Sequence, residues 1–304
     1  MSSWDLDLVA LGRISVDLYP EQIGVPLEHV RTFRKMLGGS PTNVTVAAAR
    51  NGRRAGIVTK VGDDAFGRYC TQAVEDFGVD ARLIGVHATL RTPLAFCAIH
   101  PPDHFPLLFY REPRAPDLEL SVEDLDRDII SGARVVWTTG TGLSAEPSRE
   151  ATLTALGWRG PDALTIHDLD HRPMFWSSPE AARDAGREAV SLASVAVGNR
   201  SEAAVVVGDG EPRELATRLL DLGSSLAIVK LGPEGVLAMS RDDEILVPPI
   251  PIKPLNGLGA GDAFGGALVH GLLERWPLSR WRTTRSGAGR SRCSAISTST
   301  AERA

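Results

Sequence analysis

Short apolar runs that end in glycine, asparagine or aspartate recur along the chain. Two lie near the start, at residues 6–12 (LDLVALG) and 54–62 (RAGIVTKVG). Four more follow later, at 133–140, 163–170, 194–199 and 226–232. Apolar runs of this length, bounded by turn residues, are typical of buried strands. The pattern therefore predicts these six strands.

Helical patterns lie between the runs. Residues 38–52 indicate a glycine turn followed by a helix of small residues, and 64–78, 180–193 and 211–222 indicate further helices. Strand–helix alternation is typical of a mostly parallel sheet with helices on both faces, and ligands of such folds bind at the carboxyl ends of the strands. Residues 93–112 instead alternate on either side of a proline-rich turn, which predicts a β-hairpin.

The composition is that of an ordinary globular chain of 304 residues. Hydrophobic residues make up 43% and charged residues 23%, and the formal net charge of -5 gives no indication of a nucleic-acid partner. The three cysteines and seven histidines show no metal-ligand spacing, so we expect no dedicated protein-only metal site. No segment reaches the roughly 20 apolar residues needed to cross a bilayer. We expect a cytoplasmic protein with no membrane partner.

Residues 256–268 (NGLGAGDAFGGAL) place five glycines and one aspartate within thirteen positions. If 259–262 opens a helix, its free N–H groups face one point, where a phosphate can bind. Asp262 would then be placed to accept a proton from an attacking hydroxyl, as phosphoryl transfer requires. The alternative is that Asp262 is a helix N-cap and the glycines serve close packing. The segment has neither the Walker A lysine nor a G-x-G-x-x-G pattern.

Two segments resemble the signatures of one family. Residues 256–268 resemble the C-terminal signature of the ribokinase-like (PfkB) carbohydrate kinases, and residues 38–67 resemble the N-terminal signature. The resemblance covers roughly residues 5–275. It implies an α/β domain over residues 1–276, with a doubly wound, mostly parallel central sheet and helices on both faces. It also implies a small β lid, from about 13–37 and 93–112, that closes over the sugar and excludes water.

The resemblance also implies roles for individual residues. Asp262 matches the catalytic base, and the anion hole is matched by Gly259, Ala260 and Gly261. The sugar-contacting positions are matched by Asp17, Gly38, Gly39 and Asn43. The positions associated with ATP and magnesium are matched by Asp168, Asn199, Glu202, Lys230, Gly232 and Gly235. Asp170 stands where related kinases usually have asparagine.

Several of these residues also have a purely structural interpretation. Asp17 could be a turn aspartate and Asn43 a helix cap, while Glu202 and Lys230 could be solvated surface charges. Arg111 and Arg172 fit a bidentate clamp for a substrate carboxylate or phosphate, and each fits a surface salt bridge equally well.

The resemblance implies phosphorylation of a primary hydroxyl of a small sugar acid, with ATP and Mg²⁺ as cofactors. It is greatest to members that convert 5-dehydro-2-deoxy-D-gluconate to its 6-phosphate in myo-inositol breakdown. The alternatives are a kinase for 2-keto-3-deoxygluconate or fructose, and a sugar-binding protein without nucleotide binding. A further alternative is a nucleic-acid-binding protein, and only the arginines near the end of the chain support it. By resemblance, we also expect a homodimer formed through the lid.

Residues 277–304 depart from the family pattern. From 278 onward they hold six arginines and one acidic residue, with many Ser, Thr and Gly, where relatives have an apolar helical segment bordering the adenine. We expect either a disordered basic tail or the product of a reading frame shifted near 277–281.

Overall fold

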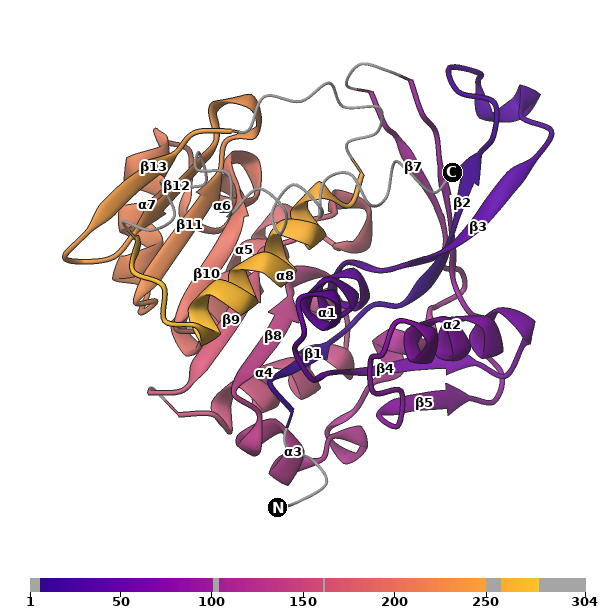
Figure 1. Ribbon diagram of the computed structural model, residues 1–304, viewed down its shortest axis with the longest axis horizontal. Coiled ribbons are helices and arrows are strands. Elements are labelled where there is room, and N and C mark those ends of the chain that lie inside the picture. Colours follow the sequence, from indigo (N-terminus) through magenta and orange to yellow (C-terminus); the bar gives the residue numbers. More distant parts are fainter. Residues whose placement is uncertain (1–5, 101–103, 161, 250–257, 279–304) are drawn as a thin grey trace.

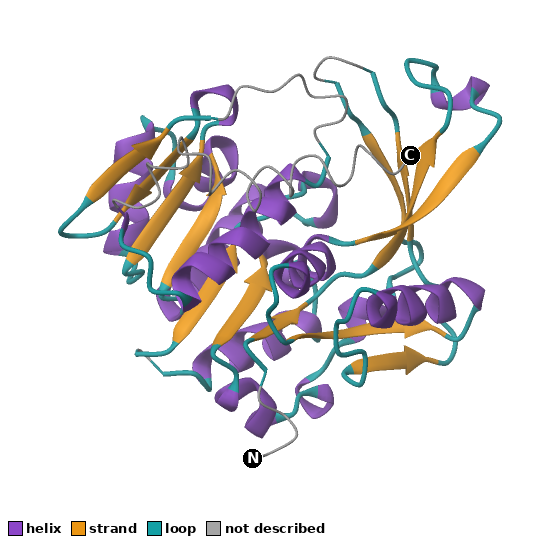
Figure 2. Cartoon of the chain, in the orientation of Figure 1, coloured by secondary structure: helices purple, strands orange, loops and turns teal. Residues whose placement is uncertain are grey.

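A nine-stranded sheet forms the centre of the protein (Figure 1; Figure 2). The computed structural model describes residues 6–100, 104–160, 162–249 and 258–278. The strands are β1 (Leu8–Leu11), β4 (Ala55–Gly62), β5 (Ile84–His87), β8 (Val135–Thr139), β9 (Leu164–Asp168), β10 (Val195–Asn199), β11 (Leu226–Lys230), β12 (Val236–Met239) and β13 (Glu244–Val247). Their spatial order is β13-β12-β11-β10-β9-β8-β1-β4-β5. Only β12 and β13 run antiparallel to their neighbours.

Helices cover both faces of this sheet. One face carries α1 (Ser40–Arg50), α2 (Ala65–Asp76) and α8 (Ala260–Leu273). The other carries α3 (Arg127–Gly132), α4 (Ser148–Gly157), α5 (Pro179–Leu192), α6 (Arg200–Val207) and α7 (Pro212–Asp221). Strand β8 shows why the strands are continuously apolar. Val135 and Trp137 belong to the core on the α1 side, whereas Val136 belongs to the core on the other face.

The six predicted strands and four predicted helices are confirmed. They correspond to β1, β4, β8, β9, β10 and β11, and to α1, α2, α5 and α7. The prediction missed the two edge strands, β5 and β13, and also β12, which lies between β13 and β11; each has four residues. Edge strands are partly exposed, so they lack the long apolar run that marks a central strand.

A second, four-stranded sheet projects from the central one and forms the lid (Figure 1). Its strands are β2 (Ser15–Pro20), β3 (Phe33–Gly38), β6 (Leu94–Cys97) and β7 (Leu107–Tyr110), in the order β3-β2-β6-β7. The predicted hairpin is confirmed as β6 and β7, which pair antiparallel. Residues 101–103 of its proline-rich turn lie outside the described residues. Phe96 packs edge-on against Phe33 and Tyr110, with ring centroids 5.3 and 5.4 Å apart, and so joins three of the four strands.

Helix α8 lies directly against α1, and two glycines permit this contact (Figure 1). A Cβ atom at Gly266 would lie 2.3 Å from the Cβ of Ala47 and 2.8 Å from its carbonyl carbon. A Cβ at Gly265 would lie 2.8 Å from both Trp137 and Val44. Any side chain at either position would push the two helices apart or distort the core. For these two glycines, the close-packing interpretation is confirmed.

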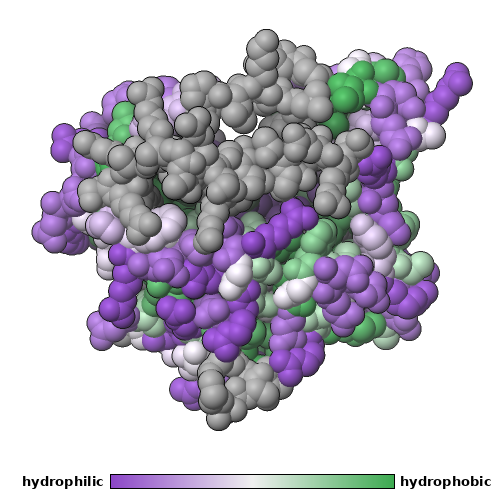
Figure 3. Space-filling view, viewed as in Figure 1, coloured by the Kyte–Doolittle hydropathy of each residue, from purple (hydrophilic) through white to green (hydrophobic). Residues whose placement is uncertain are grey.

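The described surface is largely polar on the face shown in Figure 3, with hydrophobic groups in smaller patches, one of them near the outer end of the lid. No helix within the described ranges is both long enough and apolar enough to cross a membrane. The predicted tail falls almost entirely outside these ranges, because the description ends at residue 278.

Replacing Gly266 with alanine tests the contact between α1 and α8. We expect Gly266→Ala to lower the free energy of unfolding by about 1–3 kcal/mol, the usual effect of overpacking. Gly157→Ala is the matched control, since no atom lies within 4 Å of the added Cβ, and its effect should stay within about 1 kcal/mol. Chemical denaturation measures both. Equal stability of the two variants would contradict the packing argument.

Candidate active site

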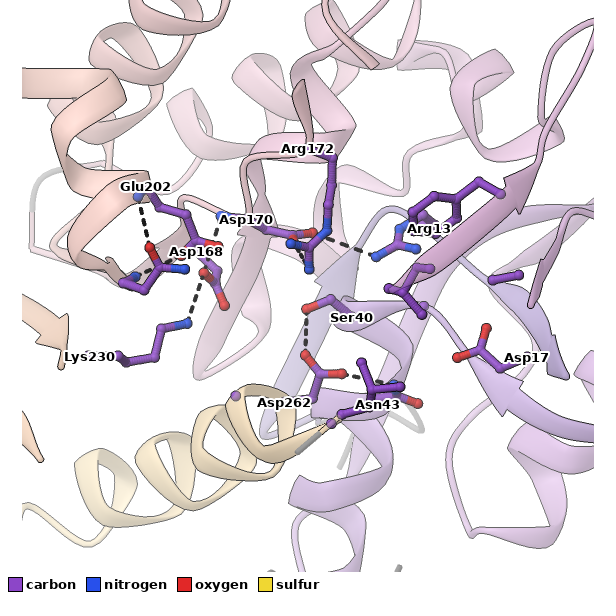
Figure 4. A pocket seen from close by; sticks show the side chains of 18 of the residues that line it. Arg13, Asp17, Ser40, Asn43, Asp168, Asp170, Arg172, Glu202, Lys230 and Asp262 are labelled. Carbon is purple, nitrogen blue, oxygen red and sulfur yellow. Dashed lines mark hydrogen bonds and ion pairs between the residues drawn. The ribbon is translucent and has the colours of Figure 1, made fainter. Parts of the chain in front are cut away.

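A cavity of about 350 Å³ lies where the lid meets the carboxyl ends of the central strands (Figure 4). Asp168, Asn199 and Lys230, the last residues of β9, β10 and β11, line one side of it. Asp17 of the lid strand β2 lines the other side. The cavity therefore lies where a parallel α/β sheet is expected to bind its ligands.

Asp262 lies at the centre of this cavity, in the first turn of α8 (Figure 4). Two residues of the first turn of α1 fix its carboxylate. Ser40 Oγ donates a hydrogen bond to Oδ1 at 2.7 Å, and Asn43 Nδ2 donates one to Oδ2 at 2.8 Å. The carboxylate therefore depends on both helices for its position, although more than 200 residues separate them in the chain.

Burial raises the pKa of Asp262 above its usual range, and the hydrogen bonds from Asn43 and Ser40 act in the opposite direction. A carboxylate with a raised pKa is a stronger base than one in water, and the two donors stabilise its ionised form. These are the properties that a general base acting on a hydroxyl requires.

The glycines at the start of α8 line the cavity and do not pack in the core. Gly259 is the N-cap residue and has a left-handed backbone (φ 78°), so the N-cap role considered for Asp262 is wrong. The N–H groups of Gly259, Ala260 and Gly261 stand at the helix start, where they lack intrahelical acceptors. A Cβ at Gly261 would lie 3.7 Å from the Lys230 ammonium nitrogen, an ordinary van der Waals contact, so the lysine cation lies beside the helix N-terminus. Asn256 and Gly257 lie outside the described residues.

Acidic groups and one lysine gather on the side of the cavity away from the lid (Figure 4). Lys230 Nζ lies 3.6 Å from Asp168 Oδ1. Burial raises the pKa of Asp168, and Lys230 opposes that rise. Glu202 is buried rather than a solvated surface charge: its carboxylate accepts a hydrogen bond from the Asn199 N–H, while Asn199 Oδ1 accepts one from the Glu202 N–H. This reciprocal cap fixes both side chains at the start of α6.

The remaining glycines of the predicted nucleotide site border the same region. Gly232 (φ 58°) lines the cavity directly. Gly235 (φ 103°) does not line it. Its Cβ would lie 2.1 Å from the carbonyl oxygen of Val247, so it permits the tight approach of β12 to the strand beside it.

The lid side of the cavity is shaped by Gly38 and Gly39. A Cβ at Gly38 would lie 2.0 Å from Asp17 Oδ1, and one at Gly39 (φ 101°) would lie 2.3 Å from the carbonyl oxygen of Arg13. These glycines therefore bring the start of α1 against β2. Asp17 accepts a hydrogen bond from Ser15 Oγ at 3.0 Å, and burial raises its pKa. Asn43 contacts Asp262 and lines the cavity, and the helix-cap interpretation is wrong, because the N-cap residue of α1 is Gly39.

Arg111 and Arg172, the two arginines predicted to bind an anion, lie in different surroundings. Arg172 lines the cavity, and its Nη2 lies 3.0 Å from Asp170 Oδ1. Arg111 is not among the lining residues. Its guanidinium forms a buried ion pair with Asp117 at 2.7 Å and lies over the Phe175 ring. We therefore do not carry Arg111 into the proposed site.

Sequence reasoning did not assign roles to three residues that the structure places here, namely Ser40, Arg13 and Asp170. Ser40 lies inside the glycine-rich segment 38–52, so that motif offered a signal for it. Asp170 accepts a hydrogen bond from the Thr141 hydroxyl and pairs with Arg172. Arg172 lies only two residues further along, whereas Thr141 follows a different strand, β8, and sequence spacing cannot reveal that contact.

The chain matches the pfkB family carbohydrate kinase profile over residues 5–292. It therefore belongs to this family, and its architecture is the ribokinase-like α/β fold. The matched range extends into the segment from residue 277 that we expected to lie outside the kinase domain.

Three known proteins illustrate the similarity. The 5-dehydro-2-deoxygluconokinase of Clostridium tetani is 33% identical over 279 residues, which are 89% of this chain and 82% of that protein. A sugar kinase of Pyrococcus horikoshii, solved in complex with ATP, is 26% identical with a TM-score of 0.79, covering 98% of this chain and 93% of that one. A fructokinase of Vibrio cholerae O395, solved with fructose, ADP and calcium ion, is 26% identical with a TM-score of 0.82, covering 98% and 94%.

Removing the Ser40 hydroxyl tests its influence on Asp262. Because this hydrogen bond stabilises the ionised carboxylate, Ser40→Ala should raise the pKa of Asp262. A base works only when ionised, so the acid limb of kcat/KM for phosphoryl transfer should move to higher pH. The measurement is the pH profile of kcat/KM, with the exposed Ser191→Ala as control. An unmoved acid limb would show that Asp262 does not act as the base.

Proposed function

We propose that this protein catalyses ATP-dependent phosphorylation of the primary hydroxyl of a small sugar acid, with 5-dehydro-2-deoxy-D-gluconate converted to its 6-phosphate. One observation carries the proposal: a carboxylate held by two hydrogen bonds stands at the N-terminus of α8, inside a cavity between lid and sheet. The name of the Clostridium tetani relative supports this choice of substrate.

Each part of the cavity has a place in this reaction. The sugar binds on the lid side, where Asp17, Asn43 and the backbone around Gly39 can contact its hydroxyls. Asp262 accepts the proton of the attacking hydroxyl as its oxygen bonds to the γ-phosphorus and the bond to the β-phosphate oxygen breaks. The free N–H groups of Gly259, Ala260 and Gly261 stabilise the charge on the transferred phosphoryl group.

The nucleotide phosphates bind on the opposite side, where Lys230 supplies a positive charge near Gly261. The ATP-bound Pyrococcus horikoshii structure supports this use of ATP. Gly232, in the turn that follows β11, borders the same region, and Gly235 ends that turn.

The residues here also fit Mg²⁺ bound together with a nucleotide. Within the described ranges, no group of three or more His, Cys, Asp or Glu residues could hold a metal ion by itself. Mg²⁺ characteristically uses one or two carboxylates, several waters and substrate phosphates. Asp168 and Glu202 would supply the carboxylates and Asn199 a neighbouring amide. When bound, the ion neutralises phosphate charge.

We also propose that two copies associate through their lids. The lid sheet ends in β3 and β7, which have unpaired edges within the described chain. On β7, Leu108 is 49% exposed and Tyr110 57% exposed, which is unusual for large apolar side chains on a strand. The proposal rests on these exposed edges together with the family resemblance.

Replacing Asp262 tests the proposed chemistry. The wild-type chain should form ADP from Mg-ATP only when the sugar acid is present. Asp262→Asn should lower kcat on the order of 1,000-fold, because the base is lost, while sugar binding measured by calorimetry changes little. Asp184→Asn, an exposed aspartate on α5, is the matched control and should retain full activity.

Two outcomes would contradict the proposal. Loss of sugar binding in a well-folded Asp262→Asn protein would assign Asp262 to binding rather than proton transfer. Folded wild-type protein that binds the sugar acid without forming ADP would favour the alternative of a non-catalytic binder.

A further inference from the structure

Arg13 lies at the junction between the central sheet and the lid, in the short connection from β1 to β2. It lines the cavity on the same side as Asp17 (Figure 4), yet it is only 6% exposed. A guanidinium is costly to bury unless its donors are satisfied. Whether its N–H donors have partners in the protein therefore indicates whether Arg13 is there to bind a ligand.

The donors of Arg13 are largely unused by the described residues. Its Nε is buried and has no partner among them. Its nearest carboxylate oxygen, Asp170 Oδ2, lies 3.8 Å from Nη2, which is beyond hydrogen-bond distance. That oxygen already accepts from the Thr141 hydroxyl at 3.1 Å, and the other oxygen of Asp170 is paired with Arg172.

The other cations near the cavity have closer partners. Arg172 Nη2 lies 3.0 Å from Asp170, Arg111 Nη2 lies 2.7 Å from Asp117, and Lys230 lies 3.6 Å from Asp168 on the opposite side of the cavity. The lining also contains several carboxylates, which repel an anionic ligand. Arg13 is thus the lining cation with the weakest existing partner and the most donors to offer.

Three contacts hold Arg13 in place without using its N–H donors. The Thr42 hydroxyl donates to its carbonyl oxygen at 2.9 Å, and Gly39 allows the start of α1 to approach the same carbonyl. On the lid side, its guanidinium carbon lies 5.5 Å from the centre of the Phe109 ring. The side chain is therefore positioned in advance, which reduces the entropy lost when a ligand binds.

We infer that Arg13 is the specificity-determining residue that binds the carboxylate of the sugar-acid substrate, an inference that rests on the proposed function. The guanidinium can donate two parallel N–H···O bonds to a carboxylate, which a neutral sugar cannot match. The substrate then spans the cavity, with its carboxylate at Arg13 and its primary hydroxyl at Asp262. Discrimination against neutral sugars follows, because they leave a buried guanidinium unpaired.

The test compares two substrates in one protein sample. We would measure kcat/KM for 5-dehydro-2-deoxygluconate and for its C1 amide, which is neutral but nearly the same size, in wild type, Arg13→Gln and Arg13→Lys. The ratio of the two values does not depend on how much of the sample is folded. Arg91→Gln, which removes an exposed arginine, controls for net charge.

We expect the acid-to-amide ratio to fall on the order of 100-fold in Arg13→Gln, less in Arg13→Lys, and not at all in Arg91→Gln. If the activity of Arg13→Gln is too low to measure, binding is compared instead, through the rise in Tm that the acid and the amide each cause. An unchanged ratio would overturn the inference. A raised KM for ATP with an unchanged acid-to-amide ratio would also overturn it, because Arg13 would then bind the phosphates of the nucleotide. Wild-type protein that phosphorylates neither compound would refute the proposed function itself, and the inference with it.

Discussion

The contact between α1 and α8 is the constraint on which the active site depends. It brings the first turns of the two helices together, so that Ser40 and Asn43 reach the carboxylate of Asp262. Gly265 and Gly266 make that approach possible, and Gly259 and Gly261 at the start of α8 line the cavity. One glycine-rich segment thus provides close packing and, in the function we propose, phosphate recognition, at positions only a few residues apart.

The same region concentrates charge that would be unfavourable in an ordinary core. Burial raises the pKa of Asp17, Asp168 and Asp262, and each is partly compensated by a hydrogen bond or a nearby cation. Such partial compensation is typical of functional sites, where groups must stay available for a ligand. The cavity is organised along one axis, from the lysine and carboxylates at the strand ends, past Asp262, to Arg13 and Asp17 beside the lid (Figure 4).

Much of the fold and part of the site could be predicted from the sequence, because central strands and glycine turns produce local patterns. The six apolar runs and the four helices predicted between them were placed correctly, and the glycine stretch indicated the start of α8. Other features have no local pattern. The short edge strands are half-exposed, and the close approach of Arg13 and Asp170 depends on how two strand ends meet. Arg111 was predicted at the site but lies outside it. Its buried partner, Asp117, is six residues away, in a connection whose shape the sequence does not specify.

The central claim is that Asp262 directs phosphoryl transfer to a primary hydroxyl. Phosphorus NMR of the product from purified protein, Mg-ATP and 5-dehydro-2-deoxygluconate tests it most directly. We expect a phosphomonoester signal coupled to the two protons of a CH₂ group, appearing as ATP is converted to ADP. A phosphate coupled to a single methine proton, or loss of ATP with release of inorganic phosphate alone, would contradict it.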